Sequence, residues 1–351
     1  MKKLRLLSLL LCFLLLCRTV VPASATETVA SVQETQPTEQ QAAQIPFGQV
    51  CIENGCRTLN GMRPLAGSDS RLDTALAAFA YETTTETVIY SYNPDTKLPT
   101  GTLAKMVTAL VAIENSNLDD IVTCSDGIQS KVPGSSQKMR PNLKSGEQLT
   151  VRDLLHGLLM IGANDAAVAL AEHVAGTTES FKEMMNARVK QMGCVSTEFG
   201  NISGLDTATS YTTAREMVKI TMEATKNETF AEIFKTATYD IPATNMVSEV
   251  RELKTLNFLI DNHTISQFMS SRYTGGIASK TDNSGASIAC TAEYNNMQVV
   301  FVVLGATRKS NEKGSVEYYG NFEEVTELAN YVFNNYKVNR IIYDGMAVNQ
   351  W

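Results

Sequence analysis

The feature that most constrains the fold is a run of apolar residues that begins with a lysine. Lys105 is followed by Met-Val-Thr-Ala-Leu-Val-Ala-Ile over 106–113, and Thr102 lies three residues before it. Residues three apart share one face of a helix, so a helix over 102–115 would place the hydroxyl beside the amine. A lysine in such a run is costly to bury unless it has a polar partner or a chemical task. The segment therefore predicts a buried helix that carries a functional pair.

Strand patterns lie at both ends of the chain and helical patterns lie between them. We expect strands over 77–81, 88–92, 286–292 and 299–304, and helices over 102–115, 149–175 (interrupted near 162–164), 181–192, 213–225 and 322–336. This order predicts an α+β fold, with an antiparallel sheet built from both chain ends, flanked by helices, and an inserted all-helical lobe.

Residues 1–25 have the pattern of a signal peptide. Basic residues precede an apolar run over 6–17, and Ala23-Ser24-Ala25 offers small residues for cleavage. The run is too short to favour a stable membrane span. We therefore expect export and cleavage near Ala25, which would place the protein outside the cytoplasm, either secreted or in the cell envelope.

The charge balance is acidic. The full chain has a net charge of −7, and residues 1–25 hold four basic and no acidic side chains, so their removal would leave −11. An acidic chain is repelled by phosphate backbones, which argues against nucleic acid as a partner.

The remaining chain divides into three predicted parts. Residues 26–70 are mostly polar, and we predict that they form a flexible linker. Within it, Cys51 and Cys56 either close a small disulfide loop or remain free thiols. A single folded domain is expected over 71–337. The remaining 338–351 form a short tail, and we expect no further domain and no C-terminal membrane anchor there.

Six segments together carry a resemblance to a known family. They are Leu98–Leu110, Asp153–Glu172, Met185–Ala187, Gly204-Leu205, Tyr211–Ala214 and Val302–Ala306. In this order they resemble the D-alanyl-D-alanine carboxypeptidases, which are low-molecular-weight penicillin-binding proteins with a β-lactamase/transpeptidase-like fold. The resemblance implies a serine-type peptidase that needs no cofactor. It also implies a ligand, namely a peptidoglycan stem peptide ending in D-Ala-D-Ala or a related wall fragment.

All three catalytic motifs of the family are altered in this chain, and the first two each change at one position. Thr102 takes the place of the serine in Ser-x-x-Lys, and Lys105 is retained. The threonine keeps a hydroxyl, but its methyl group stiffens the side chain and crowds the approach of a carbonyl carbon. In the Ser-x-Asn motif Gly162 replaces the serine that relays protons, while Asn164 is retained. We predict Thr102, Lys105 and Asn164 as the catalytic positions, with Gly162 beside them. We also expect the amine of Lys105 to form a hydrogen bond with Asn164 or Thr102.

The third motif, Lys-Thr-Gly, lies on an edge strand in the family and binds the terminal carboxylate of the substrate. Lys280-Thr281-Asp282 looks like a copy that has lost its glycine. Counting back without a gap from the last strand instead places the motif on Ile277-Ala278-Ser279, and we favour this register. Both registers leave Ile277, Ala278, Ser279, Lys280 and Thr281 as candidate substrate-binding residues, and both lose the glycine.

These changes favour weak or no carboxypeptidase activity, because the elements of one catalytic machine act as a unit. The alternative function is a non-catalytic protein that binds peptidoglycan or a partner. A β-lactamase is disfavoured, since no deacylating base can be identified. No metal site is expected, because His156, His173 and His263 lack the spacing of metal ligands.

Overall fold

The computed structural model describes residues 49–52, 55–58, 72–261, 266–310 and 316–338, all within one compact unit, Ile45–Trp351. The predicted signal peptide and most of the predicted linker lie outside the described residues. Two short strands of the linker region, β1 (Gln49–Ile52) and β2 (Gly55–Thr58), pair so that Cys51 stands opposite Cys56. The disulfide between them stays a prediction.

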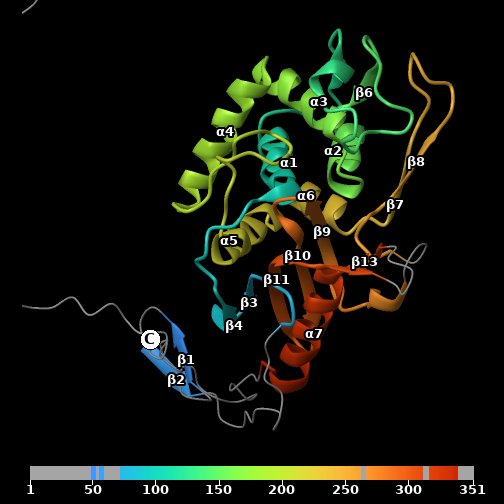
Figure 1. The fold of residues 1–351 in the computed structure, drawn as a ribbon. Helices are drawn as coiled ribbons and strands as arrows, with labels where there is room; N and C mark the ends of the chain where they lie inside the picture. Colours follow the sequence, from blue (N-terminus) through green and yellow to red (C-terminus); the bar gives the residue numbers. More distant parts are fainter. Residues whose placement is uncertain (1–48, 53–54, 59–71, 262–265, 311–315, 339–351) are drawn as a thin grey trace, which may run out of the picture. The chain divides into compact units, whose positions relative to one another are not determined.

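The central sheet is built from both ends of the folded region, as the sequence predicts (Figure 1). Its five antiparallel strands are ordered β4-β3-β11-β10-β9. They are β3 (Ala77–Glu82), β4 (Thr87–Tyr92), β9 (Tyr273–Thr281), β10 (Gly285–Tyr294) and β11 (Met297–Ala306). Because β9 is at the edge, one side of its backbone is left available for pairing with a ligand.

The helices that lie between β4 and β9 along the chain form the inserted lobe, and the last helix follows β11. The described α-helices are α1 (Lys105–Glu114), α2 (Val151–Met160), α3 (Asn164–Ala175), α4 (Thr178–Gln191), α5 (Ala214–Thr225), α6 (Glu228–Phe234) and α7 (Gly320–Asn335). The expected break between α2 and α3 is present, and Thr213 caps α5 by accepting a hydrogen bond from the backbone of Glu216.

The first predicted helix differs from the structure at its start. Gly101–Ala104 form a 3₁₀ turn, η2, and the α-helix begins only at Lys105. Gly101 has φ +51°, a left-handed conformation that glycine adopts readily, and a β-carbon there would lie 2.4 Å from Ser279 Oγ. The chain therefore enters α1 through a tight turn pressed against β9, and Thr102 belongs to that turn.

Several short elements were missed because their patterns are too brief to detect. These are β5 (Ile121–Thr123), β6 (Gln148–Thr150), β7 (Thr238–Ile241), β8 (Arg251–Lys254), β12 (Arg308–Ser310), β13 (Val316–Tyr319), η3 (Ile128–Lys131), η4 (Ser266–Phe268) and helix α6.

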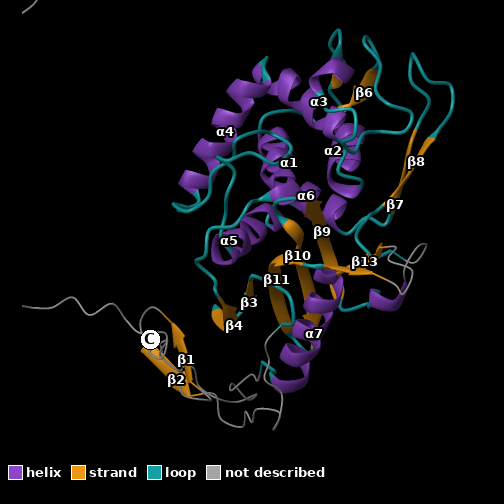
Figure 2. Ribbon diagram, viewed as in Figure 1, coloured by secondary structure: helices purple, strands orange, loops and turns teal. Residues whose placement is uncertain are grey.

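Helices cover the sheet on both faces (Figure 2). An apolar core lies against each face. The larger one joins the inner sheet face to the helical lobe, and α1 runs through it with every residue from Lys105 to Ala112 buried. The smaller core packs α7 against β10 and β11. This arrangement encloses Lys105, as the apolar run predicts.

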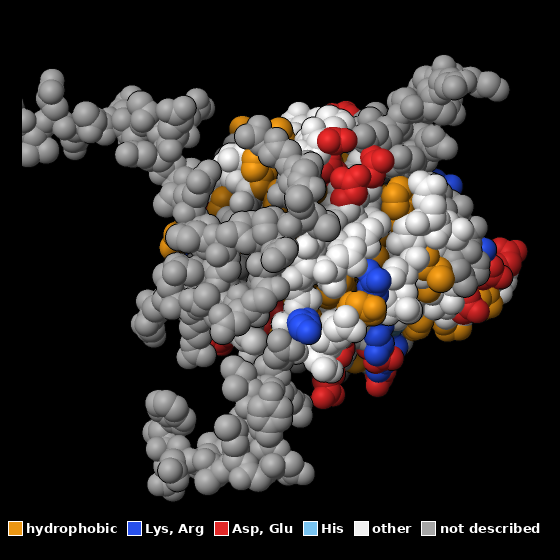
Figure 3. Space-filling model, turned by 90° about the horizontal axis from the view of Figure 1, so that it is seen from below, with side chains coloured by type: hydrophobic (Ala, Val, Ile, Leu, Met, Phe, Trp, Pro, Cys, Tyr) orange, Lys and Arg blue, Asp and Glu red, His pale blue; other side chains and the backbone are white. Residues whose placement is uncertain are grey.

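On the face shown in Figure 3, hydrophobic side chains occur in small separate groups among charged ones. None of the described helices has the length and apolar character needed to cross a membrane.

Candidate active site

The pair at the start of α1 is brought together as the spacing predicts. Thr102 is half-buried in η2, and Lys105 is 2% exposed. Burial favours the uncharged amine and lowers the pKa of Lys105 to about 7. A lysine with such a pKa can accept and release protons near neutral pH.

The partner of Lys105 differs from our expectation. We expected its amine to bond to Asn164 or Thr102, but Nζ donates to the backbone oxygen of Ser203 at 2.6 Å. One turn further along α1, Thr108 Oγ1 donates to the backbone oxygen of Ile202, also at 2.6 Å. The two side chains thus hold consecutive carbonyl groups of one loop, which draws the amine toward that loop.

Asn164 and Gly162 flank the break between α2 and α3. The backbone N–H of Asn164 donates to the carbonyl of Gln137 at 2.9 Å, and its side chain is 4% exposed. Gly162 has φ +69°, and a β-carbon there would lie 3.6 Å from Thr102 Cγ2. The position that lacks a hydroxyl therefore faces the threonine methyl group, and a serine there would cost about 1–2 kcal/mol of backbone strain.

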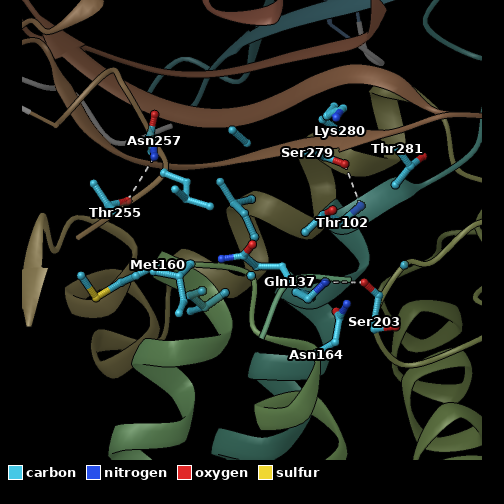
Figure 4. Close-up of a pocket in the computed structure, with 18 of the residues that line it drawn as sticks. Thr102, Gln137, Met160, Asn164, Ser203, Thr255, Asn257, Ser279, Lys280 and Thr281 are labelled. Atoms are coloured by element: carbon cyan, nitrogen blue, oxygen red, sulfur yellow. Dashed lines mark hydrogen bonds between the residues drawn. The ribbon is translucent and has the colours of Figure 1, made fainter. Parts of the chain in front are cut away.

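Residues on β9 alternate in the manner of a strand. Ile277 and Ser279 are each 3% exposed and face the helical lobe, while Ala278 is half-buried and Lys280 exposed. Ser279 Oγ accepts a hydrogen bond from the backbone N–H of Thr102 at 2.7 Å (Figure 4). The Ser279 side chain is therefore the one that meets the candidate nucleophile.

Thr281, at the end of β9, closes one side of the site. Its hydroxyl donates to Asp206 Oδ1 at 2.6 Å, and the other carboxylate oxygen of Asp206 accepts from the backbone of Asn283 at 3.1 Å. The end of β9 is thereby tied to the loop whose Ser203 carbonyl holds Lys105.

All nine predicted site residues line one cavity of about 490 Å³ between the sheet edge and the helical lobe. They are Thr102, Lys105, Gly162, Asn164, Ile277, Ala278, Ser279, Lys280 and Thr281. A volume of this size suits a short peptide or another small ligand.

The sequence did not reveal the rest of the lining. The missed residues include Ser135–Gln137, Leu159–Ile161, Ser203–Leu205, Thr255–Phe258, Asn321 and Phe322. Leu159–Ile161 and Gly204-Leu205 lie in segments that carry the family resemblance, but no local pattern marked them as site residues. The others reach the cavity through tertiary packing, which leaves no local pattern.

Within the described part of the chain, no group of three or more His, Cys, Asp and Glu residues is placed so that it could hold a metal ion. His156 is stacked on Tyr239, and its Nδ1 donates to the backbone oxygen of Arg152. His173 lies 3.9 Å from a carboxylate oxygen of Asp120, and His263 falls outside the described residues.

Comparison with known proteins gives a consistent result. The sequence pattern of the D-alanyl-D-alanine carboxypeptidase family of peptidases matches residues 68–308. The chain is 29% identical over 244 residues to a D-alanyl-D-alanine carboxypeptidase of Streptomyces sp. K15, which covers 66% of this chain and 81% of the relative. It is 28% identical over 274 residues to DacF of Bacillus subtilis, covering 76% of this chain and 64% of the relative.

Solved structures show the same fold. The Streptomyces K15 DD-transpeptidase superposes with a TM-score of 0.64 at 26% identity, covering 74% of this chain and 96% of that one. A D-alanyl-D-alanine carboxypeptidase from Mycobacterium tuberculosis also gives 0.64, at 21% identity over 77% of this chain and 94% of the other. The family match, the relatives and the fold agree, and the chain belongs to the D-alanyl-D-alanine carboxypeptidase family.

Proposed function

We propose that this protein is an exported member of the family that binds peptidoglycan stem peptides and has weak or no carboxypeptidase activity. The observation that carries the proposal is the hydrogen bond from the backbone N–H of Thr102 to Ser279 Oγ, at 2.7 Å. Acyl-transfer enzymes stabilise the oxyanion of their intermediate with backbone N–H groups, often including that of the nucleophile itself. Here a hydroxyl oxygen occupies the place that the oxyanion would take.

Three other features of the site also favour weak or no carboxypeptidase activity. The nucleophile position carries a methyl group, Gly162 supplies no hydroxyl relay, and the amine of Lys105 bonds to the Ser203 carbonyl. Removal of one oxyanion donor costs on the order of 10²–10³ in rate, and loss of linked catalytic groups adds to that deficit. Binding is less affected, because the cavity and the available edge of β9 remain.

Peptide binding and D-Ala release can be measured separately. We would titrate the protein with a stem pentapeptide ending in D-Ala-D-Ala by calorimetry and assay free D-Ala in the same solution. The proposal predicts saturable binding and D-Ala release close to that of Thr102→Ala, which serves as the matched control. Rapid release that this substitution abolishes would show an active carboxypeptidase, and failure to bind the peptide would remove the proposed function altogether.

A further inference from the structure

Three asparagines line the cavity, and each has a buried amide atom with no hydrogen-bond partner among the residues that the structure describes. These atoms are Asn164 Oδ1, Asn257 Nδ2 and Asn321 Oδ1. Buried polar atoms in native proteins nearly always have a partner, so each unpaired one calls for an explanation. Other buried atoms of this kind lie elsewhere in the described chain, and these three are the ones that line the cavity. They mark where polar groups of a ligand would bind.

For two of the three, the orientation of the amide is fixed by its other atom. Asn257 Oδ1 accepts from the backbone N–H of Leu259 at 3.1 Å, so the unpaired Nδ2 is a donor. Asn321 Nδ2 donates to the backbone oxygen of Ser287 at 2.9 Å, so the unpaired Oδ1 is an acceptor. The two side chains are 2% and 1% exposed. The structure thus holds one unpaired donor and one unpaired acceptor in set orientations.

The two asparagines belong to neighbouring segments at one end of the cavity. The residues that follow them, Phe258 and Phe322, have ring centroids 4.7 Å apart. Asn257 Nδ2 lies against β9, since a β-carbon at Gly276 would be 2.8 Å from it. In Figure 4, Asn257 lies well away from the group formed by Thr102 and Ser279. This end is therefore a second region of the cavity beside the edge strand.

The chemistry of this region fits an amide better than a carboxylate. An amide presents an acceptor oxygen to Asn257 Nδ2 and a donor N–H to Asn321 Oδ1. An ionised carboxylate has acceptors only, so its negative oxygen would face Asn321 Oδ1 without a proton between them. In the register without a gap, Ile277 also replaces the lysine that the family resemblance assigns to the terminal carboxylate.

We propose that Asn257 and Asn321 form a subsite for an uncharged amide group of a peptide ligand, in place of a free terminal carboxylate. The inference rests on the proposed function, because it assumes that the cavity binds a peptide. The amide comes from one of two sources: a C-terminal carboxamide, or a peptide bond of a chain that continues past the second D-Ala. Lys280 lines the same cavity and is the group that would favour a carboxylate instead.

Three peptides of one sequence test the proposal by calorimetry. One ends in D-Ala-D-Ala with a free carboxylate, one ends in the D-Ala-D-Ala carboxamide, and one continues with an added glycine. We expect the carboxamide to bind about tenfold more tightly than the acid, as for one satisfied buried hydrogen bond. Equally tight binding of the extended peptide would assign the amide to a continuing chain, and weaker binding would assign it to a chain end.

Substitutions at the two asparagines provide the second arm. Asn257→Asp keeps the acceptor for Leu259 but removes the donor, so it should lose the preference for the amide. Asn321→Leu removes the acceptor and should have the same effect. Asn117→Asp, at an exposed position outside the cavity, is the matched control and should leave the preference unchanged. Thermal unfolding of each variant identifies any that fail to fold.

Several outcomes would overturn the inference. The first is that the acid binds as tightly as the carboxamide or more tightly. The second is that Asn257→Asp still prefers the carboxamide, and the third is that Lys280→Gln specifically loses binding of the acid. The fourth is a crystal structure of the complex in which only a water joins the two asparagines. If peptides bind without discrimination, this inference fails while the proposed function stands. If no peptide binds the unaltered protein, both fail.

Discussion

At the scale of single residues, function depends on which atoms already have partners. The backbone N–H of Thr102 is engaged by Ser279, while the amine of Lys105 is engaged by the Ser203 carbonyl. In the proposed function the first contact would oppose acylation, because the donor would have to leave Ser279 before it could reach an oxyanion. The second contact directs the amine at the Ser203 carbonyl instead of the threonine hydroxyl.

The low pKa of Lys105 has a consequence for stability. The pKa is about 7 in the folded protein against 10.5 for the free side chain, so between these values the unfolded chain binds more protons. Stability should therefore rise with pH from about 7 to about 10 through this group. We expect Lys105→Met to be more stable than the parent at pH 7, with a difference in urea midpoint that shrinks toward pH 10. A difference independent of pH would contradict the burial-lowered pKa.

At the scale of elements, β9 determines what the site presents to a ligand. Its alternation turns Ile277 and Ser279 toward the helical lobe and leaves Lys280 exposed. A shift by one residue would exchange these faces, so the register decides which side chains meet Thr102.

Which residues occupy the place of the Lys-Thr-Gly motif can be tested by restoring the motif through substitution. In a Thr102→Ser, Gly162→Ser background, adding Ile277→Lys, Ala278→Thr and Ser279→Gly should increase labelling by a fluorescent penicillin, since these changes restore the cation and free the Thr102 N–H. Asp282→Gly in the same background is the matched control and should add nothing. Labelling recovered by Asp282→Gly alone would show that the motif lies on Lys280-Thr281-Asp282.

The hairpin formed by β7 and β8 is anchored on α2 by a stacked pair. The rings of His156 and Tyr239 have centroids 3.5 Å apart and planes 11° apart, and the Tyr239 hydroxyl donates to Asp153 Oδ1 at 2.9 Å. Arg251 at the start of β8 forms a fully buried ion pair with Glu147 at 2.7 Å. These contacts hold in place the chain that continues to Asn257.

Burial lowers the pKa of His156 below its usual value of 6.5, so the folded protein favours the neutral ring. As pH falls below about 6.5, the unfolded chain takes up a proton that the folded chain resists, and stability should fall. His156→Phe retains an aromatic ring against Tyr239 and should reduce this dependence between pH 6.5 and 5, measured by urea unfolding. His173→Phe removes a histidine outside the stack and is the control. An unchanged slope in His156→Phe would contradict the assignment.

At the scale of the whole molecule, the sheet and the helical lobe share one core. Phe79 and Val302 from the sheet, and Leu110 and Leu158 from the helices, belong to the same buried cluster. Because the two lobes bury their apolar surface against each other, we expect one cooperative thermal transition, with equal calorimetric and van't Hoff enthalpies. Two resolved transitions would show that the helical lobe folds independently.

The sequence predicts the central architecture because its signals are local and strong. The apolar run of α1 and the break near Gly162 can be recognised without knowledge of contacts. The Ser203 partner of Lys105 could not be predicted, since the two residues are 98 positions apart and the contact uses a backbone oxygen. Asn257 and Asn321 were missed for a related reason, because nothing in a local pattern shows which buried amides lack partners.

The most direct test of the account is the intact mass of the protein after incubation with benzylpenicillin. Attack by a hydroxyl oxygen on the β-lactam carbonyl forms an ester, breaks the ring C–N bond and transfers a proton to the ring nitrogen, so each acylation adds the mass of one penicillin. We predict that the unaltered protein keeps its original mass and that the Thr102→Ser, Gly162→Ser, Ser279→Gly variant gains the adduct. Rapid, stoichiometric modification of the unaltered protein, abolished by Thr102→Ala, would contradict the account.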